Sequence, residues 1–164
     1  MHTACVRART DPHWMTSDMN TNFSYDVHAG DIEQGGSASA ALKSELRKIG
    51  ICEEQARRAG IIVFEGEMNL LVYATNGGTV NATVTSEAIT ITIEDAGPGI
   101  ADIDLAMTPG YSTAPDWALN LGFGAGMGLV NMQRNSNFFE IHSHTGKGTL
   151  IRCRVNRRKN DAAD

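Results

Sequence analysis

The sequence has few of the features that mark several common protein classes. Only three of its 164 residues are cysteines, and Cys5, Cys52 and Cys153 stand far apart. This spacing indicates neither a disulfide framework nor a zinc site with paired cysteines. No apolar run approaches the roughly 18 residues of a membrane-spanning helix, and none follows the basic N-terminal residues as in a secretion signal. We therefore expect a cytoplasmic protein with reduced thiols.

An excess of basic charge is also missing. The chain has 14 Lys and Arg residues against 19 Asp and Glu residues, which gives a net charge of −5. No overall field therefore attracts nucleic acid or an anionic membrane, and a basic run from Arg152 to Lys159 is typical of a solvated tail. We expect neither nucleic acid nor a membrane as a partner.

The length and the 41% hydrophobic content suit a single domain with its own core. Residues 1–22 show no apolar periodicity and are predicted to be a flexible N-terminal extension. Residues 156–164 are predicted to be a charged C-terminal tail. The domain is therefore expected to span residues 23–155.

Apolar residues at helical spacing predict a helix over residues 38–49, with Gly50 where a helix C-cap residue belongs. A longer helix is predicted over residues 53–75, although the β-branched and aromatic run at 61–64 favours a strand by propensity. A shorter helix is expected at about 127–136. The apolar residues expected on one face of the long helix, at spacings of three and four, are Ile61, Phe64, Met68 and Leu71.

Alternation of apolar and polar residues predicts five strands. Their ranges are 23–28, 79–85, 88–94, 138–144 and 149–155. Helices followed by runs of strands predict an α/β two-layer sandwich, in which a mixed, largely antiparallel sheet packs on helices. A doubly wound parallel sheet is not expected.

Glu65 and Asn69 stand four residues apart on the predicted long helix, so both side chains project from one face. A carboxylate in this position can act as a general base, and an amide oxygen can bind Mg²⁺, which prefers oxygen ligands. By itself the pair is more typical of a solvated helix surface.

Asp95-Ala96-Gly97-Pro98-Gly99 follows a predicted strand directly. A carboxylate at the end of a strand can accept a hydrogen bond from an exocyclic amine, and glycines let the backbone approach a flat ring closely. The alternative interpretation is an ordinary Asp-Gly-Pro turn.

A glycine run leads into the predicted helix at 127–136 and contains Gly122, Gly124, Gly126 and Gly128. Free backbone N–H groups at a helix N-terminus favour a phosphate, although such a run can also be a flexible hinge. The run matches neither the phosphate loop nor the dinucleotide fingerprint, so both common nucleotide folds are disfavoured.

Taken in order, four motifs resemble the N box and glycine boxes of the GHKL superfamily of ATPases and kinases. They are Glu65-x-x-x-Asn69, Asp95-x-Gly97-Pro98-Gly99, Gly122 to Gly128, and Gly146-x-Gly148-Thr149. Within the superfamily, the segment Gly110-Tyr111-Ser112-Thr113 and the compact length of the chain resemble those of the stand-alone anti-sigma regulatory serine/threonine kinases.

The resemblance implies a Bergerat-type fold that binds ATP with Mg²⁺. In such a site Glu65 would be the general base and Asn69 would hold Mg²⁺. Asp95 would bind the adenine amine, with Thr149 close to the base. The glycines that would border the base or close over the phosphates are Gly97, Gly99, Gly122, Gly124, Gly126 and Gly128.

The leading hypothesis is a kinase that phosphorylates Ser or Thr of a STAS-domain regulatory protein in a partner-switching pathway. The alternative is a non-catalytic module that ATP and ADP switch between holding and releasing a sigma factor or another protein. A histidine kinase catalytic domain without its body is a third hypothesis. A second copy of the chain, in a homodimer, is a further candidate partner.

The segment 114–121 is longer than the simplest lids of such kinases. Its Trp117 either covers the site or a partner, or packs an ordinary loop, because tryptophan is enriched at both kinds of surface. His142 and His144 share one face of a predicted strand, where paired surface residues are favoured over a metal site.

Overall fold

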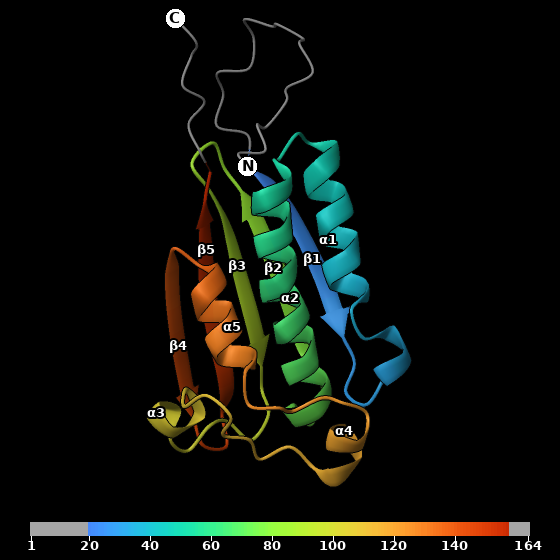
Figure 1. Cartoon of the computed structure of the whole chain (residues 1–164), viewed down its shortest axis with the longest axis vertical. Helices are drawn as coiled ribbons and strands as arrows, with labels where there is room; N and C mark the ends of the chain where they lie inside the picture. The colour runs from blue at the N-terminus through green and yellow to red at the C-terminus, as the bar shows by residue number, and fades with distance from the viewer. Residues whose placement is uncertain (1–19, 158–164) are drawn as a thin grey trace, which may run out of the picture.

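The computed structural model describes residues 20–157, which form a helical layer on one face of a five-stranded sheet (Figure 1). The helices of the layer are α1 (Ser37–Lys48), α2 (Glu53–Tyr73) and α5 (Gly128–Asn135). The remaining helical segments are short: η1 (Ile32–Gln34), α3 (Ile103–Ala106) and α4 (Asp116–Asn120). The predicted two-layer α/β sandwich is confirmed.

The sheet has the strand order β1-β2-β3-β5-β4. Its strands are β1 (Thr21–Val27), β2 (Gly78–Val84), β3 (Ala88–Asp95), β4 (Phe138–His144) and β5 (Gly148–Asn156). Within residues 20–157 every strand pair is antiparallel. The central strand β3 pairs with β5 so that its last residue, Asp95, lies opposite Thr149. Two motifs that are 54 residues apart in sequence therefore meet at one end of the sheet.

Helix α2 contains the β-branched run 61–64 in helical conformation, as predicted. The predicted buried stripe is only partly right, because Phe64 is 40% exposed whereas Ile62, Val63 and Leu70 are buried. The reason is that α2 packs against the sheet, α1 and α5 together, so its buried surface is wider than one stripe.

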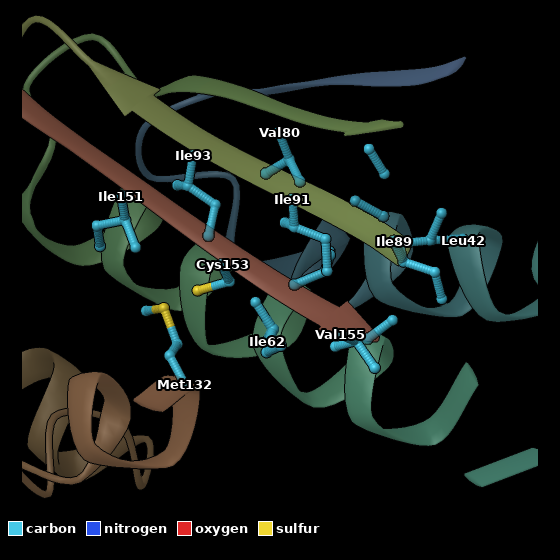
Figure 2. Packing of buried hydrophobic residues seen from close by; sticks show 14 of the residues in the cluster. Leu42, Ile62, Val80, Ile89, Ile91, Ile93, Met132, Ile151, Cys153 and Val155 are labelled. Carbon is cyan, nitrogen blue, oxygen red and sulfur yellow. The ribbon is translucent and has the colours of Figure 1, made fainter. Parts of the chain in front are cut away.

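The hydrophobic core lies between α2 and the inner face of the sheet (Figure 2). Ile91 of β3, Cys153 of β5, Ile62 of α2 and Met132 of α5 all point into it. Burial raises the pKa of the Cys153 thiol to about 11, so this side chain stays protonated and packs like a small apolar group.

The structure also tests the expected boundaries. Strand β1 begins at Thr21, so the last residues of the predicted extension 1–22 belong to the domain, and residues 1–19 lie outside the described part. Strand β5 continues to Asn156, and residues 158–164 of the predicted tail are likewise outside it. Helix α1 ends at Lys48 with Ile49 as its C-cap residue, and Gly50 follows at φ 82°, the left-handed conformation that commonly ends a helix. None of the helices in residues 20–157 has the length and apolar character needed to cross a membrane.

Candidate nucleotide site

The predicted site residues lie at one end of the two layers. In Figure 1 the C-terminal end of α2, the end of β3 and the start of α5 meet at the lower end of the molecule. Helices α3 and α4 lie at the same end. Three separate stretches of sequence thus supply one site.

Glu65 and Asn69 project from α2 toward the start of α5. A Cβ built on Gly128, the first residue of α5, would lie 3.3 Å from Glu65 Oε2 and 3.5 Å from Asn69 Oδ1. Because Gly128 has no side chain, these oxygens can lie close to the first turn of α5. The free N–H groups of that turn favour an anion, while the two oxygens favour a cation or a donor.

Asn131 belongs to the same group, although no sequence motif included it. Its Nδ2 atom donates a hydrogen bond of 2.7 Å to Glu65 Oε1. The two residues are 66 positions apart, so only the packing of α5 against α2 reveals the contact.

The Asp95 turn, residues 95–99, follows the end of β3 and packs on the end of α2. The Gly97 N–H donates to Asp95 Oδ1 at 2.7 Å and thereby fixes the carboxylate. A Cβ on Gly97 would lie 3.2 Å from the Cα atom of Ala74, so this turn packs directly on the helix end. Gly99 has a φ of +72°, a conformation that favours glycine.

The last glycine motif, residues 146–149, is hydrogen-bonded to this turn. Gly146 N–H donates to the Pro98 carbonyl at 2.7 Å. Thr149 Oγ1 lies 2.8 Å from Ser143 Oγ, which also accepts a hydrogen bond of 2.8 Å from the Ile100 N–H. Ser143 therefore ties Thr149 to the Asp95 turn. Sequence reasoning missed it, although its inward position on β4 between two exposed histidines was a signal.

The glycines of the run 122–128 have different surroundings. The residues with positive φ are Gly122, Gly124 and Gly126, at 85°, 79° and 74°. The carbonyl of Gly126 accepts a hydrogen bond of 2.9 Å from Gly110 N–H, and a Cβ on Gly124 would meet the side chain of Ala114. A Cβ on Gly122 would meet nothing within 4 Å. Among the four, only Gly128 is thus shown beside Glu65 and Asn69.

The sequence profile of the histidine kinase-, DNA gyrase B- and HSP90-like ATPases matches residues 54–159. The chain belongs to this GHKL family. The matched region contains all four motifs and the contacts that join them.

Two relatives of this GHKL protein are similar to different extents. The serine/threonine-protein kinase RsbT of Bacillus subtilis (strain 168) is 29% identical over 151 residues, which are 92% of this chain and 93% of RsbT. The anti-sigma F factor of Thermoanaerobacter sp. (strain X514) is 39% identical over 74 residues, 45% of this chain and 48% of that protein. The chain thus spans about half the length of such anti-sigma F factors.

A solved structure, the histidine kinase AdeS of Acinetobacter baumannii, is 16% identical with a TM-score of 0.48. The similarity covers 85% of this chain and 68% of that one.

The segment 114–121 of the GHKL domain folds around the short helix α4. Ala118 is buried, whereas Trp117 is 42% and Leu121 56% exposed. The Tyr73 hydroxyl at the end of α2 lies 3.4 Å from Ser112 Oγ, which accepts a hydrogen bond of 3.1 Å from the N–H of Ala114 at the start of the segment. Much of the indole of Trp117 thus remains accessible.

His142 and His144 lie exposed on the sheet face opposite the helices, as the surface interpretation predicts. His142 Nε2 is 3.0 Å from Glu140 Oε1, and Arg152 Nη1 donates to the same carboxylate at 3.2 Å. Within residues 20–157 no three His, Cys, Asp or Glu side chains form a group that could hold a metal ion.

A buried carboxylate, Glu67, lies on α2 between the site residues Glu65 and Asn69. It is 1% exposed and accepts hydrogen bonds of 2.9 Å from the Ala38 and Ser39 N–H groups at the start of α1. Burial raises the pKa of Glu67, while these hydrogen bonds oppose the shift. Glu67 therefore anchors α1 to the helix that carries the site.

Proposed function

We propose that the chain is a Mg-ATP-dependent serine/threonine protein kinase that acts on a STAS-type regulatory protein in a partner-switching pathway. The observation that carries the proposal is the convergence of Glu65 Oε2 and Asn69 Oδ1 on the start of α5. A candidate base, a candidate metal ligand and a helix end that favours anions thus lie together.

The residues present fit an adenine nucleotide. Asp95 is half-buried, is fixed through one oxygen by Gly97, and can accept a hydrogen bond from an exocyclic amine. Thr149 stands opposite it with a hydroxyl. Asn69 would hold Mg²⁺, and the first turn of α5 would receive phosphates. When bound, Mg-ATP supplies the phosphoryl group and the metal charge that stabilises its transfer.

Glu65 is the proposed general base. Its Oε2 atom lies beside Gly128, where it would take the proton of an incoming hydroxyl. Asn69, one turn further along α2, keeps the metal ligand next to the base. Phosphoryl transfer depends mainly on positioning and on charge stabilisation. A base, a metal ligand and a helix end that binds phosphate are therefore the groups that the protein would supply.

The family and the relatives support this proposal. Membership of an ATPase family favours ATP as the ligand, and RsbT, which is similar over 92% of this chain, is named a serine/threonine-protein kinase. The other relatives are named anti-sigma F factors, which favours a protein partner in transcription control. The exposed Trp117 and Leu121, in and directly after α4 at the same end of the molecule, offer an apolar surface for that partner.

The alternative function is a non-catalytic module that holds a sigma factor or another protein in a nucleotide-dependent manner. The names of the anti-sigma F factors favour it. Glu65 favours the kinase, because a pure switch needs no base.

Labelled ATP, Mg²⁺ and STAS proteins from the same genome test the proposal. We expect one STAS protein to gain a phosphate on Ser or Thr, and Glu65→Gln to abolish transfer while nucleotide stays bound. Nucleotide-dependent binding of the partner without any phosphorylated Ser or Thr in mass spectra would favour the switch. Acid-labile phosphohistidine on this chain would favour the histidine kinase hypothesis.

A further inference from the structure

Asn131 stands one turn inside α5, three residues after the glycine that opens the helix. Its amide donates to Glu65 Oε1 at 2.7 Å, which is within the range of hydrogen bonds to a charged acceptor. Both side chains are half-buried. The contact thus joins the proposed base to the helix whose first turn faces the proposed phosphate position.

This hydrogen bond distinguishes the two oxygens of the Glu65 carboxylate. Oε1 is occupied by Asn131. Oε2 lies beside Gly128, as does Asn69 Oδ1. A glutamate side chain has three rotatable bonds, so without a fixed partner it would spread over several orientations.

Asn131 is itself held in place by the packing of α5. Arg58 lies two turns before Glu65 on α2, and its Nε atom donates to the Asn135 carbonyl at 3.0 Å. Its Nη2 atom donates to Asn137 Oδ1 at 3.0 Å. Helix α2 therefore contacts α5 through polar groups at two places, at Asn131 and at the C-terminal end of α5.

We propose that Asn131 is a positioning residue, which fixes Glu65 so that Oε2 faces the start of α5. The inference rests on the proposed function for the role of Glu65. Because Asn131 and the first turn of α5 belong to one rigid helix, the base and the phosphate position keep a constant relation to each other. A displacement of α5 displaces both.

The variants Asn131→Leu and Asn131→Asp test the proposal. Leucine has a similar size but no donor, and aspartate places a second carboxylate beside Glu65. Gln133→Leu, at an exposed position of the same helix, is the matched control. Asn131→Gln, which restores an amide, is the rescue variant.

In a single-turnover phosphoryl transfer, we expect Asn131→Leu to slow the reaction about tenfold, with ATP affinity changed less than about threefold. Asn131→Asp should be slower still, because like charges repel. Gln133→Leu should leave the rate unchanged, and Asn131→Gln should recover part of it.

A second readout needs no phosphoryl transfer. In nitrogen-15 NMR spectra, the Asn131 side-chain amide protons should exchange slowly with water and shift markedly in Glu65→Ala. Equal transfer rates in Asn131→Leu and wild type, or amide protons that ignore Glu65→Ala, would overturn the inference. If wild type transfers no phosphate while the amide depends on Glu65, the kinase proposal fails and the positioning of Glu65 stands.

Discussion

At the scale of single residues, the proposed nucleotide recognition depends on Asp95 being a hydrogen-bond acceptor. Asp95→Asn keeps the shape but can present a donor to the exocyclic amine of adenine. We expect ATP affinity, measured by calorimetry, to fall by about tenfold to a hundredfold. Asp104→Asn, at an exposed position of α3, is the control and should bind like wild type. Unchanged affinity in Asp95→Asn would place the adenine elsewhere.

Glu67 makes a different prediction at the same scale, because it stabilises the fold. Each of its oxygens accepts one N–H of α1. Glu67→Gln offers one acceptor where two are needed and leaves a buried N–H without a partner. Chemical denaturation should show a free energy of unfolding lower by about 1–3 kcal/mol at neutral pH. An equally stable variant would mean that these hydrogen bonds contribute little.

The pH dependence of this loss has a definite sign. Burial, the largest cause, raises the pKa of Glu67 above its ordinary value of 4.5, so the folded protein binds the proton more tightly. The resulting stabilisation is fully present below 4.5 and is lost as the pH rises through the raised folded pKa. Gln has no such titration. The stability difference between wild type and Glu67→Gln should therefore widen on acidification from about pH 8 to about pH 5.

At the scale of elements, a substitution at the start of α5 is expected to change ligand affinity without changing stability. Gly128→Ala adds a methyl group 3.3 Å from Glu65 Oε2, where Asn131 leaves the carboxylate little freedom to move. The higher helix propensity of alanine, about 1 kcal/mol, offsets the tight contact, so the unfolding free energy should change little. Mg-ATP affinity should fall about tenfold or more, because the methyl group fills the phosphate position. Full affinity in this variant would contradict that position.

The short helix α4 carries the prediction about the partner. Trp117→Ala removes a large exposed side chain near the site, so partner affinity should fall about tenfold while ATP affinity stays the same. Phe138→Ala, an exposed aromatic at the far end of β4, is the control. Pull-down and calorimetry with the unphosphorylated form of the STAS protein that accepts phosphate provide the measurement. A loss of ATP binding instead would show that Trp117 covers the nucleotide.

At the scale of the whole molecule, long periodic segments could be predicted and short or tertiary features could not. Helix α2 was recognisable because its 21 residues outweigh a local strand propensity. Helices α3 and α4, with four and five residues, are too short to show a period. The exposure of Phe64 could not be predicted because it depends on how three neighbours pack around α2.

The same distinction holds for the candidate site. Glu65, Asn69 and Asp95 were recognisable because each belongs to a motif with fixed spacing. Asn131 and Ser143 were not, since each acts through contacts with parts of the chain that the sequence does not relate to it. Their identification required the register of β4 with β5 and the packing of α5 on α2.

Calorimetric titration of the whole chain with ATP, ADP and GTP in the presence of Mg²⁺ tests the central claim most directly. The claim is that the end of the sheet next to α2 and α5 is an adenine nucleotide site. We expect the protein to bind ATP and ADP but not GTP. At the ring position of the adenine amine, guanine has no amine from which Asp95 could accept a hydrogen bond. Absence of adenine nucleotide binding, or equal affinity for GTP, would contradict the account.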